Sequence, residues 1–255
     1  MPDDRITAVL FDRGETIRNF GRVNTTKAFL QGARATHAYL REHGQHVGTL
    51  PCYFVLNLVR LRLRYVMANI TRRDFNSLEV LQTVGARKGV KLSPQQWEQF
   101  AWLWYEPLGR CAQVEEDLRQ TLEKLRSQGL KLGIVSNTFV SRSSLERHLR
   151  ILGILDFFPM QLYSHEVDVR KPSSEIFRIA AERIGEPVTK IMVVGDRIDN
   201  DIHPALQNGM TAVLKEAYTN TGKETPPGAL RIRRLSELPA LIERLNGTES
   251  GRGNS

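Results

Sequence analysis

The sequence has few cysteines and no long uncharged hydrophobic run. Cys52 and Cys111 are the only two cysteines among 255 residues, and the six histidines fit no zinc-ligand or catalytic spacing. These counts exclude a disulfide scaffold and a zinc finger. The most apolar long stretch, residues 53–67, is interrupted by three arginines, so we expect no membrane span. Because the amino terminus is too polar to be a signal peptide, we expect a cytoplasmic protein.

Positive charge is concentrated in one part of the chain. The formal net charge is +8, and residues 15–106 hold thirteen Lys or Arg against six Asp or Glu. This imbalance indicates either a surface that attracts anions, such as phosphates, or a solvated arginine-rich helical face. We interpret Arg60 and Arg64, one helical turn apart, as such a face rather than as substrate contacts. Binding to nucleic acid is a remoter interpretation that the basic segment leaves open, and the sequence does not define the oligomeric state.

Short apolar runs alternate with amphipathic helical patterns over much of the chain. The first run, residues 6–12, is rich in β-branched residues and ends in Asp12. Further strands are predicted at residues 130–136, 160–164, 191–195 and 210–214, with helices at 114–127, 144–152 and 174–184. This alternation predicts an α/β protein with a Rossmann-like, doubly wound parallel sheet.

Residues 16 to about 105 break the alternation and carry helical patterns only. Helices are predicted over residues 24–44, 51–68 and 75–88, and a fourth is predicted to begin at Pro94 with Ser93 as its N-cap. In that last helix Trp97, Phe100 and Trp104 fall at helical spacing, which favours core packing over a ligand site. We therefore expect an inserted all-helical domain.

These patterns give a predicted domain organisation. Residues 1–15 and 106–246 form the α/β core, residues 16–105 form the helical insertion, and residues 247–255 form a disordered tail. In an open α/β sheet, ligands bind at the carboxyl ends of the strands, so the polar residues that follow the predicted strands are the candidates for function.

Four polar positions follow predicted strands. Asp12 ends the first, Ser136 and Asn137 end the second, Lys171 follows the third, and Asp196 follows the fourth, with Asp201 five residues later. A carboxylate can attack phosphorus, and hard oxygen ligands from Asp12, Asp196 and Asp201 suit Mg²⁺. Ser136 can donate to a phosphoryl oxygen, and Lys171 can neutralise its charge.

The four segments around these residues resemble the motifs of the haloacid dehalogenase (HAD)-like hydrolase superfamily. They are residues 9–16, 135–137, 170–177 and 194–201. The helical insertion is similar to the family's C1-type cap. The resemblance implies Asp12 as nucleophile, Ser136, Asn137 and Lys171 as phosphate-binding residues, and a metal site made by Asp12, the Gly14 carbonyl, Asp196 and Asp201. It also implies Mg²⁺ as cofactor.

One position departs from the family's phosphatases. They carry a second aspartate two residues after the nucleophile, where this chain has Gly14 and places an acid, Glu15, one residue later. A one-residue shift on a turn directs the side chain elsewhere. Loss of a positioned proton donor costs about two to four orders of magnitude in rate.

The sequence therefore predicts a Mg²⁺-dependent phosphatase of a small, anionic phosphorylated metabolite, acting through an aspartyl-phosphate at Asp12. Two alternatives remain open. One is a non-catalytic phosphate-binding or interaction protein on the same fold, which Gly14 and the basic cap motivate. The other is a metal-independent 2-haloacid dehalogenase-type hydrolase, in which Asp12 attacks carbon.

Overall fold

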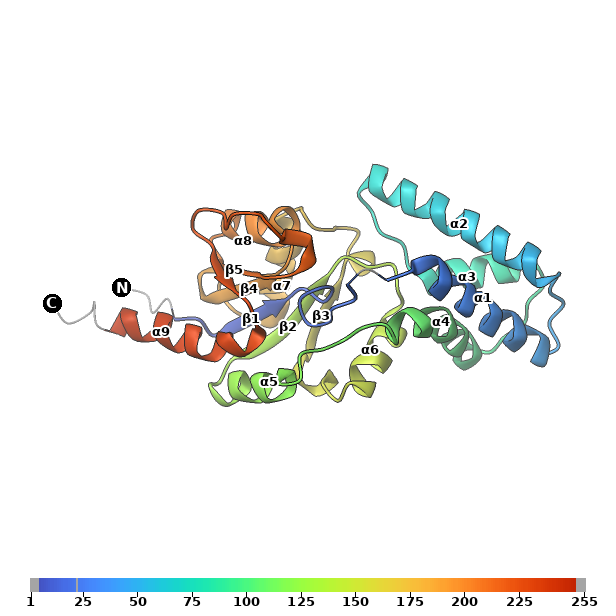
Figure 1. Cartoon of the computed structure of the whole chain (residues 1–255). Helices are drawn as coiled ribbons and strands as arrows, with labels where there is room; N and C mark the ends of the chain where they lie inside the picture. Colours follow the sequence, from blue (N-terminus) through green and yellow to red (C-terminus); the bar gives the residue numbers. More distant parts are fainter. Residues whose placement is uncertain (1–4, 22, 251–255) are drawn as a thin grey trace. The chain divides into compact units, whose positions relative to one another are not determined.

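The computed structural model describes residues 5–21 and 23–250, apart from the side chains of residues 248–250 (Figure 1). The described residues fall into two compact units. The first unit comprises residues 5–21, 113–137 and 153–250, and the second comprises residues 23–112 and 138–152. The segment 138–152 thus groups with most of the helical insertion, although it lies far from it in the sequence. The predicted domain boundaries stay predictions.

The first unit is built on a six-stranded sheet in the order β3-β2-β1-β4-β5-β6, with every neighbouring pair parallel. Its strands are β1 (Ala8–Phe11), β2 (Lys131–Ser136), β3 (Met160–Tyr163), β4 (Ile191–Gly195), β5 (Thr211–Lys215) and β6 (Leu230–Ile232). This confirms the predicted α/β fold with a doubly wound parallel sheet. Because β1 lies between β2 and β4, the carboxyl ends of these three strands are neighbours.

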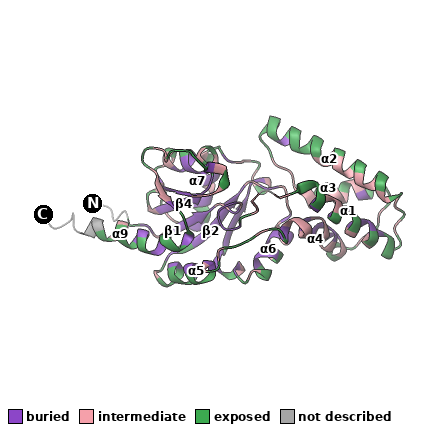
Figure 2. Ribbon diagram, in the orientation of Figure 1, coloured by how far each residue is buried: buried purple, intermediate pink, exposed green. Residues whose placement is uncertain are grey.

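Helices cover the sheet and bury its apolar residues. They are α5 (Leu118–Ser127), α7 (Glu175–Ile184), α8 (His203–Gln207) and α9 (Leu238–Ser250). Figure 2 shows the strands β1, β2 and β4 as buried and the outer faces of the helices as exposed. Leu10 and Val193 from the strands pack with Phe177 of α7 in one core. Helix α9 includes residues 247–250, where we expected a disordered tail, and the rest of that tail, residues 251–255, lies outside the described residues.

The second unit consists of helices and the loops that join them. They are α1 (Thr25–Glu42), α2 (Leu50–Thr71), α3 (Ser77–Ala86), α4 (Pro94–Gly109) and α6 (Arg142–Ile151). Ser93 caps α4 as predicted, since its side chain accepts from the backbone of Gln96 and the Gln96 side chain accepts from the backbone of Ser93. Trp97 and Phe100 are buried together, as expected for core packing. Of the helices described, not one has both the length and the apolar character that crossing a bilayer requires.

Candidate functional site

The carboxyl ends of the central strands bring several predicted site residues to one edge of the sheet in the first unit. Asp12 directly follows β1, and its backbone N–H donates to the carbonyl of Val194 in β4 at 2.8 Å. Ser136 is the last residue of β2, and Asp196 directly follows β4. The parallel register therefore places residues that are far apart in the chain at neighbouring strand ends.

Lys171 joins two of the predicted carboxylates. Its Nζ donates to Oδ1 of Asp12, to Oδ1 of Asp201 at 2.6 Å and to the carbonyl of Val135 at 3.1 Å. The side chains of Lys171, Asp12 and Asp201 are only 3%, 12% and 1% exposed. Burial lowers the pKa of Lys171, but the charges of Asp12 and Asp201 raise it by more, so this pKa lies above its ordinary value. The ammonium group is therefore charged and fixed beside Asp12.

Asn137 positions the backbone of Lys171. The Asn137 amide accepts from the backbone N–H of Lys171 and donates to its carbonyl, both at 2.8 Å. These two hydrogen bonds link the end of β2 to the loop that carries Lys171. The structure thus shows Asn137 as a positioning residue, and the phosphate contact that we expected for it stays a prediction.

Asp201 lies in a single π-helical turn, η4 (Ile198–Ile202), shortly after β4. Its Oδ1 accepts from Lys171, and its Oδ2 accepts from the backbone N–H of Arg197 at 3.0 Å. A Cβ on Gly195 would lie 2.4 Å from both Cβ and Cγ of Asp201, so only glycine permits this close approach. The geometry favours Asp201 as the residue that holds Lys171, and its predicted role as a metal ligand stays a prediction.

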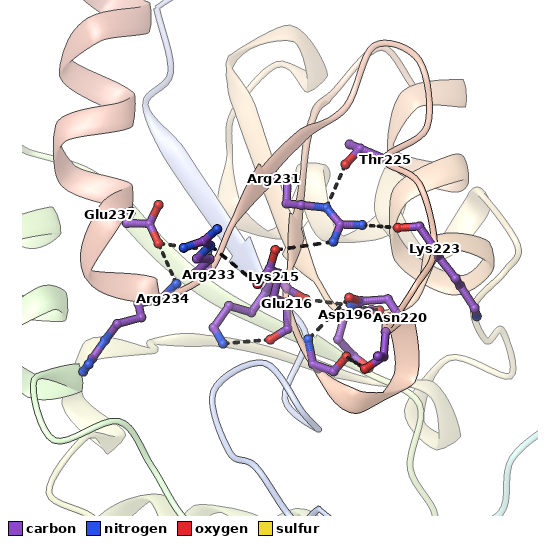
Figure 3. Close-up of polar contacts among 12 residues, drawn as sticks. Asp196, Lys215, Glu216, Asn220, Lys223, Thr225, Arg231, Arg233, Arg234 and Glu237 are labelled. Atoms are coloured by element: carbon purple, nitrogen blue, oxygen red, sulfur yellow. Dashed lines mark hydrogen bonds and ion pairs between the residues drawn. The ribbon is translucent and has the colours of Figure 1, made fainter.

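Three residues that the sequence analysis missed contact Asp196. Thr219 donates to its Oδ2 at 2.5 Å, and Thr16 donates to its Oδ1 at 3.4 Å. The Asn220 amide donates to the backbone carbonyls of Asp196 and Lys215, both at 2.8 Å (Figure 3). Thr219 and Asn220 follow β5. The rule that ligands gather after strands would have singled them out, had the fifth strand been included in the search.

The carboxylates at this edge carry more negative charge than Lys171 neutralises. Burial and the nearby charge of Asp12 raise the pKa of Asp196, and burial, with a smaller contribution from Asp12, raises that of Asp201. Asp12 and Asp201 contact the buried Lys171 ammonium, and Asp196 lies close enough for its pKa to respond to the same charge. A cluster of this composition is suited to bind a further positive charge.

The carboxylates at this edge of the sheet offer oxygen donors to a divalent metal ion. Within the described residues, no group of three or more His, Cys, Asp or Glu side chains could hold a metal ion by itself. Mg²⁺ does not require one, because it is usually bound through one or two carboxylates, with water and substrate phosphate as the remaining ligands. Asp12 and Asp196 supply two hard oxygen donors that repel each other. These residues therefore fit a magnesium ion whose remaining coordination positions are filled by water and phosphate.

The turn after Asp12 contains Gly14, which stands where the related phosphatases carry a second aspartate, and then Glu15. A Cβ on Gly14 would meet only Oδ2 of Asp12, at 3.9 Å, so the space beside the Asp12 carboxylate is open. Glu15 has φ 56°, and its Oε1 accepts from the backbone N–H of Phe20 at 2.9 Å. The Glu15 carboxylate thus stabilises its own turn.

Comparison with known proteins gives one family over most of the chain. Residues 6–209 match the family model described as haloacid dehalogenase-like hydrolase. The chain is 34% identical to a glyceraldehyde 3-phosphate phosphatase of Methanocaldococcus jannaschii over 128 residues, 49% of this chain and 55% of the relative. It is 31% identical to the pyrimidine 5'-nucleotidase YjjG of Escherichia coli over 114 residues, 44% of this chain and 49% of the relative. The matched segments thus span about half the length of these curated relatives.

Solved structures agree with the fold over nearly the whole chain. A HAD phosphatase from Thermococcus onnurineus superposes with a TM-score of 0.59 at 25% identity, covering 93% of this chain and 98% of that one. A 2-haloacid dehalogenase from Pseudomonas syringae pv. Tomato DC3000 also gives a TM-score of 0.59, at 24% identity, covering 94% and 99%. This second likeness shows the fold alone, because one fold hosts different reactions.

Proposed function

Because the chain belongs to the haloacid dehalogenase-like hydrolases, we propose that it is a Mg²⁺-dependent phosphatase of a small phosphorylated metabolite, with Asp12 as the nucleophile. One observation supports this most directly: the charged, buried Lys171 holds Asp12 beside Asp201, and Asp196 lies close enough for Asp12 to perturb its pKa. The named activities of the matched phosphatases support the same reaction class.

In the proposed reaction a carboxylate oxygen of Asp12 forms a bond to phosphorus while the bond from phosphorus to the leaving oxygen breaks. Water then cleaves the phosphoaspartate, which releases inorganic phosphate and restores the carboxylate. Lys171 fixes Asp12 and offsets charge on the transferring group, and Ser136 donates to a phosphoryl oxygen. Asn137 and Asp201 hold Lys171 in place.

Asp12, the Gly14 carbonyl and Asp196 would hold Mg²⁺, with Thr16 and Thr219 orienting the Asp196 carboxylate. When bound, the ion supplies positive charge that lets a carboxylate approach a phosphate dianion. The second unit, which contains most of the predicted insertion, would serve as the C1-type cap and choose the substrate.

Gly14 restricts the leaving group in this proposal. No side chain at position 14 can protonate the departing oxygen. The Glu15 carboxylate accepts a hydrogen bond from the backbone N–H of Phe20. Acyl or anomeric phosphates, whose leaving groups need little protonation, are therefore the favoured substrates. Other phosphate esters would need a proton from the substrate itself.

The test is phosphate release from acetyl phosphate and p-nitrophenyl phosphate in the presence of Mg²⁺. Asp12→Asn removes the nucleophile, so we expect a loss of at least about a thousandfold in kcat. Asp199→Asn is the matched control, because the Asp199 side chain is 86% exposed and lies 3.8 Å from the exposed His203 ring. A rate that survives in Asp12→Asn would remove Asp12 from the mechanism.

Metal removal separates the remaining alternatives. We expect EDTA to abolish phosphate release and added Mg²⁺ to restore it. Hydrolysis of a 2-haloacid that is insensitive to EDTA would favour the dehalogenase-type reaction. A wild-type chain that binds phosphate but releases none from any ester would favour the non-catalytic binding protein.

A further inference from the structure

The second unit contains a partly open cavity of about 270 Å³. Residues from α1, α2, α3 and α4 line it, together with Phe75 and the segment that follows Asn137, and all of these lie in the second unit. The volume is near the lower limit of sites that take small organic molecules. The residues that line the cavity all belong to the second unit, whereas the carboxylate cluster described above is made by residues of the first.

Aromatic and aliphatic side chains form the walls of the cavity. The rings of Phe29 and Trp104 lie 4.8 Å apart, and those of Phe75 and Phe139 are stacked at 5.3 Å with an angle of 14°. Leu81 of α3 adds an aliphatic surface. Paired rings of this kind hold their orientation and offer flat apolar faces, so the cavity is suited to an alkyl chain or an aromatic ring.

The cavity also contains positive charge without a balancing acid. Arg60 and Arg64 of α2 line it, and none of the described residues around it is Asp or Glu. The Arg60 Nη1 is buried, and within the described part of the chain it has no hydrogen-bond partner. The Arg64 guanidinium lies over the Phe75 ring at 5.9 Å. A buried guanidinium donor without an acceptor is costly, and an anionic group of a ligand would supply the acceptor.

We propose that this cavity binds an amphipathic organic anion, with its apolar body between the aromatic walls and its carboxylate or phosphate paired to Arg60. The inference is independent of hydrolysis at Asp12, since binding requires no turnover. The anionic head can come from a phosphorylated metabolite or from a free carboxylate, and the two sources are distinguished by titration.

The probes are octyl phosphate, octanoate, octanol and inorganic phosphate, titrated into the full chain by calorimetry. Asp12→Asn protein is used so that octyl phosphate stays intact. We expect both octyl anions to saturate one site, octanol to bind at least about tenfold more weakly, and inorganic phosphate not to compete at this site. Tighter binding of octyl phosphate would point to a phosphorylated ligand, and tighter binding of octanoate to a carboxylate.

Variants on α2 test the role of the arginine. Arg60→Gln should weaken both octyl anions at least about tenfold while leaving octanol unchanged, and Arg60→Lys should retain part of the affinity. Arg62→Gln is the control, because Arg62 is exposed on the same helix and does not line the cavity. The Tm of each variant establishes that it is folded.

A second readout does not depend on an arginine variant. Trp104 lines the cavity, so ligand entry should change its fluorescence, and Trp104→Phe should remove that change while preserving most of the binding. Octanol binding as tightly as octanoate, Arg60→Gln binding like the wild type, or no saturation with any octyl probe would each overturn the proposal.

Discussion

At the scale of single residues, the site depends on contacts between side chains that are remote in sequence. Sequence patterns identified Asp12, Lys171 and Asp196, because each follows a strand and the edge of a parallel sheet concentrates such residues. The contact of Asp201 with Lys171 and Arg197 was not predictable, since it depends on a π-helical turn that no local pattern indicates. The hydroxyl of Thr219 was overlooked for a simpler reason: only polar residues after the first four predicted strands were considered, and Thr219 follows the fifth.

Gly14 gives a prediction at the same scale. Since a Cβ there meets only Asp12 Oδ2 at 3.9 Å, Gly14→Asp should fit and place a proton donor next to Asp12, the proposed nucleophile. We expect kcat/KM for phenyl phosphate to rise about a hundredfold relative to that for acetyl phosphate, whose leaving group needs no acid. Steady-state kinetics on both esters measures the ratio. Gly14→Asn, of similar size but without an acidic proton, should leave the ratio unchanged, and an equal gain in Asn and Asp variants would refute the acid role.

At the scale of secondary-structure elements, the prediction from the sequence was best where strong periodicity coincided with a cap or a turn signal. Helix α4 begins at Pro94 as expected, because the Ser93 cap and the following proline fix its start. Helix α9 (Leu238–Ser250) and strand β6 (Leu230–Ile232) were not predicted. Strand β6 has only three residues, too few for a periodic signal, and it is stabilised by pairing with β5.

One contact between elements predicts how stability changes with pH. Glu186, just after α7, accepts from Thr7 at 2.7 Å and pairs with Lys131 of β2 at 2.6 Å. The bond to Lys131, followed by that to Thr7, holds the pKa of Glu186 below its ordinary value of 4.5. A carboxyl with a depressed pKa stabilises the fold above its unfolded pKa, and that contribution is lost as the pH falls through the folded value.

Glu186→Gln should therefore lower the urea midpoint at pH 7, and the difference from the wild type should shrink as the pH falls below about 4.5. Urea titrations between pH 7 and pH 3 measure the difference. Glu116→Gln, at an exposed position, is the control and should show no such trend. A difference in urea midpoint that stays constant between pH 7 and pH 3 would show that Glu186 acts through packing rather than charge.

At the scale of the whole molecule, the charge is divided between the two units. The described residues of the second unit hold fifteen Lys or Arg and six Asp or Glu, whereas those of the first hold nineteen and twenty. The sequence analysis located this excess, because it follows from counting charged residues. The cavity of the second unit was not predictable: Arg60 was interpreted as part of a solvated face, yet its Nη1 is buried.

This division predicts nonspecific attraction to polyanions. The chain should be retained on immobilised heparin at low salt, and the double variant Arg62→Glu, Arg73→Glu should elute at lower salt. Lys124→Glu with Lys223→Glu changes the net charge by the same amount, at exposed positions in the first unit. We expect this second double variant to lower the salt concentration of elution less than the first does. Equal shifts for the two double variants would mean that only total charge matters.

The near-contact between Gly195 and Asp201 has a consequence for how the protein can evolve. Asp201 fills the space next to Gly195, so no side chain larger than hydrogen fits at position 195. Substitution of Gly195 therefore depends on which residue stands at position 201. Because the added Cβ would lie 2.4 Å even from the Cβ of Asp201, a lineage that replaces Gly195 must put glycine at position 201 or move its backbone. In either case Lys171 loses one of its two carboxylates. Relatives that lack the glycine should therefore also lack the aspartate, and this one-way dependence is visible by sequencing alone.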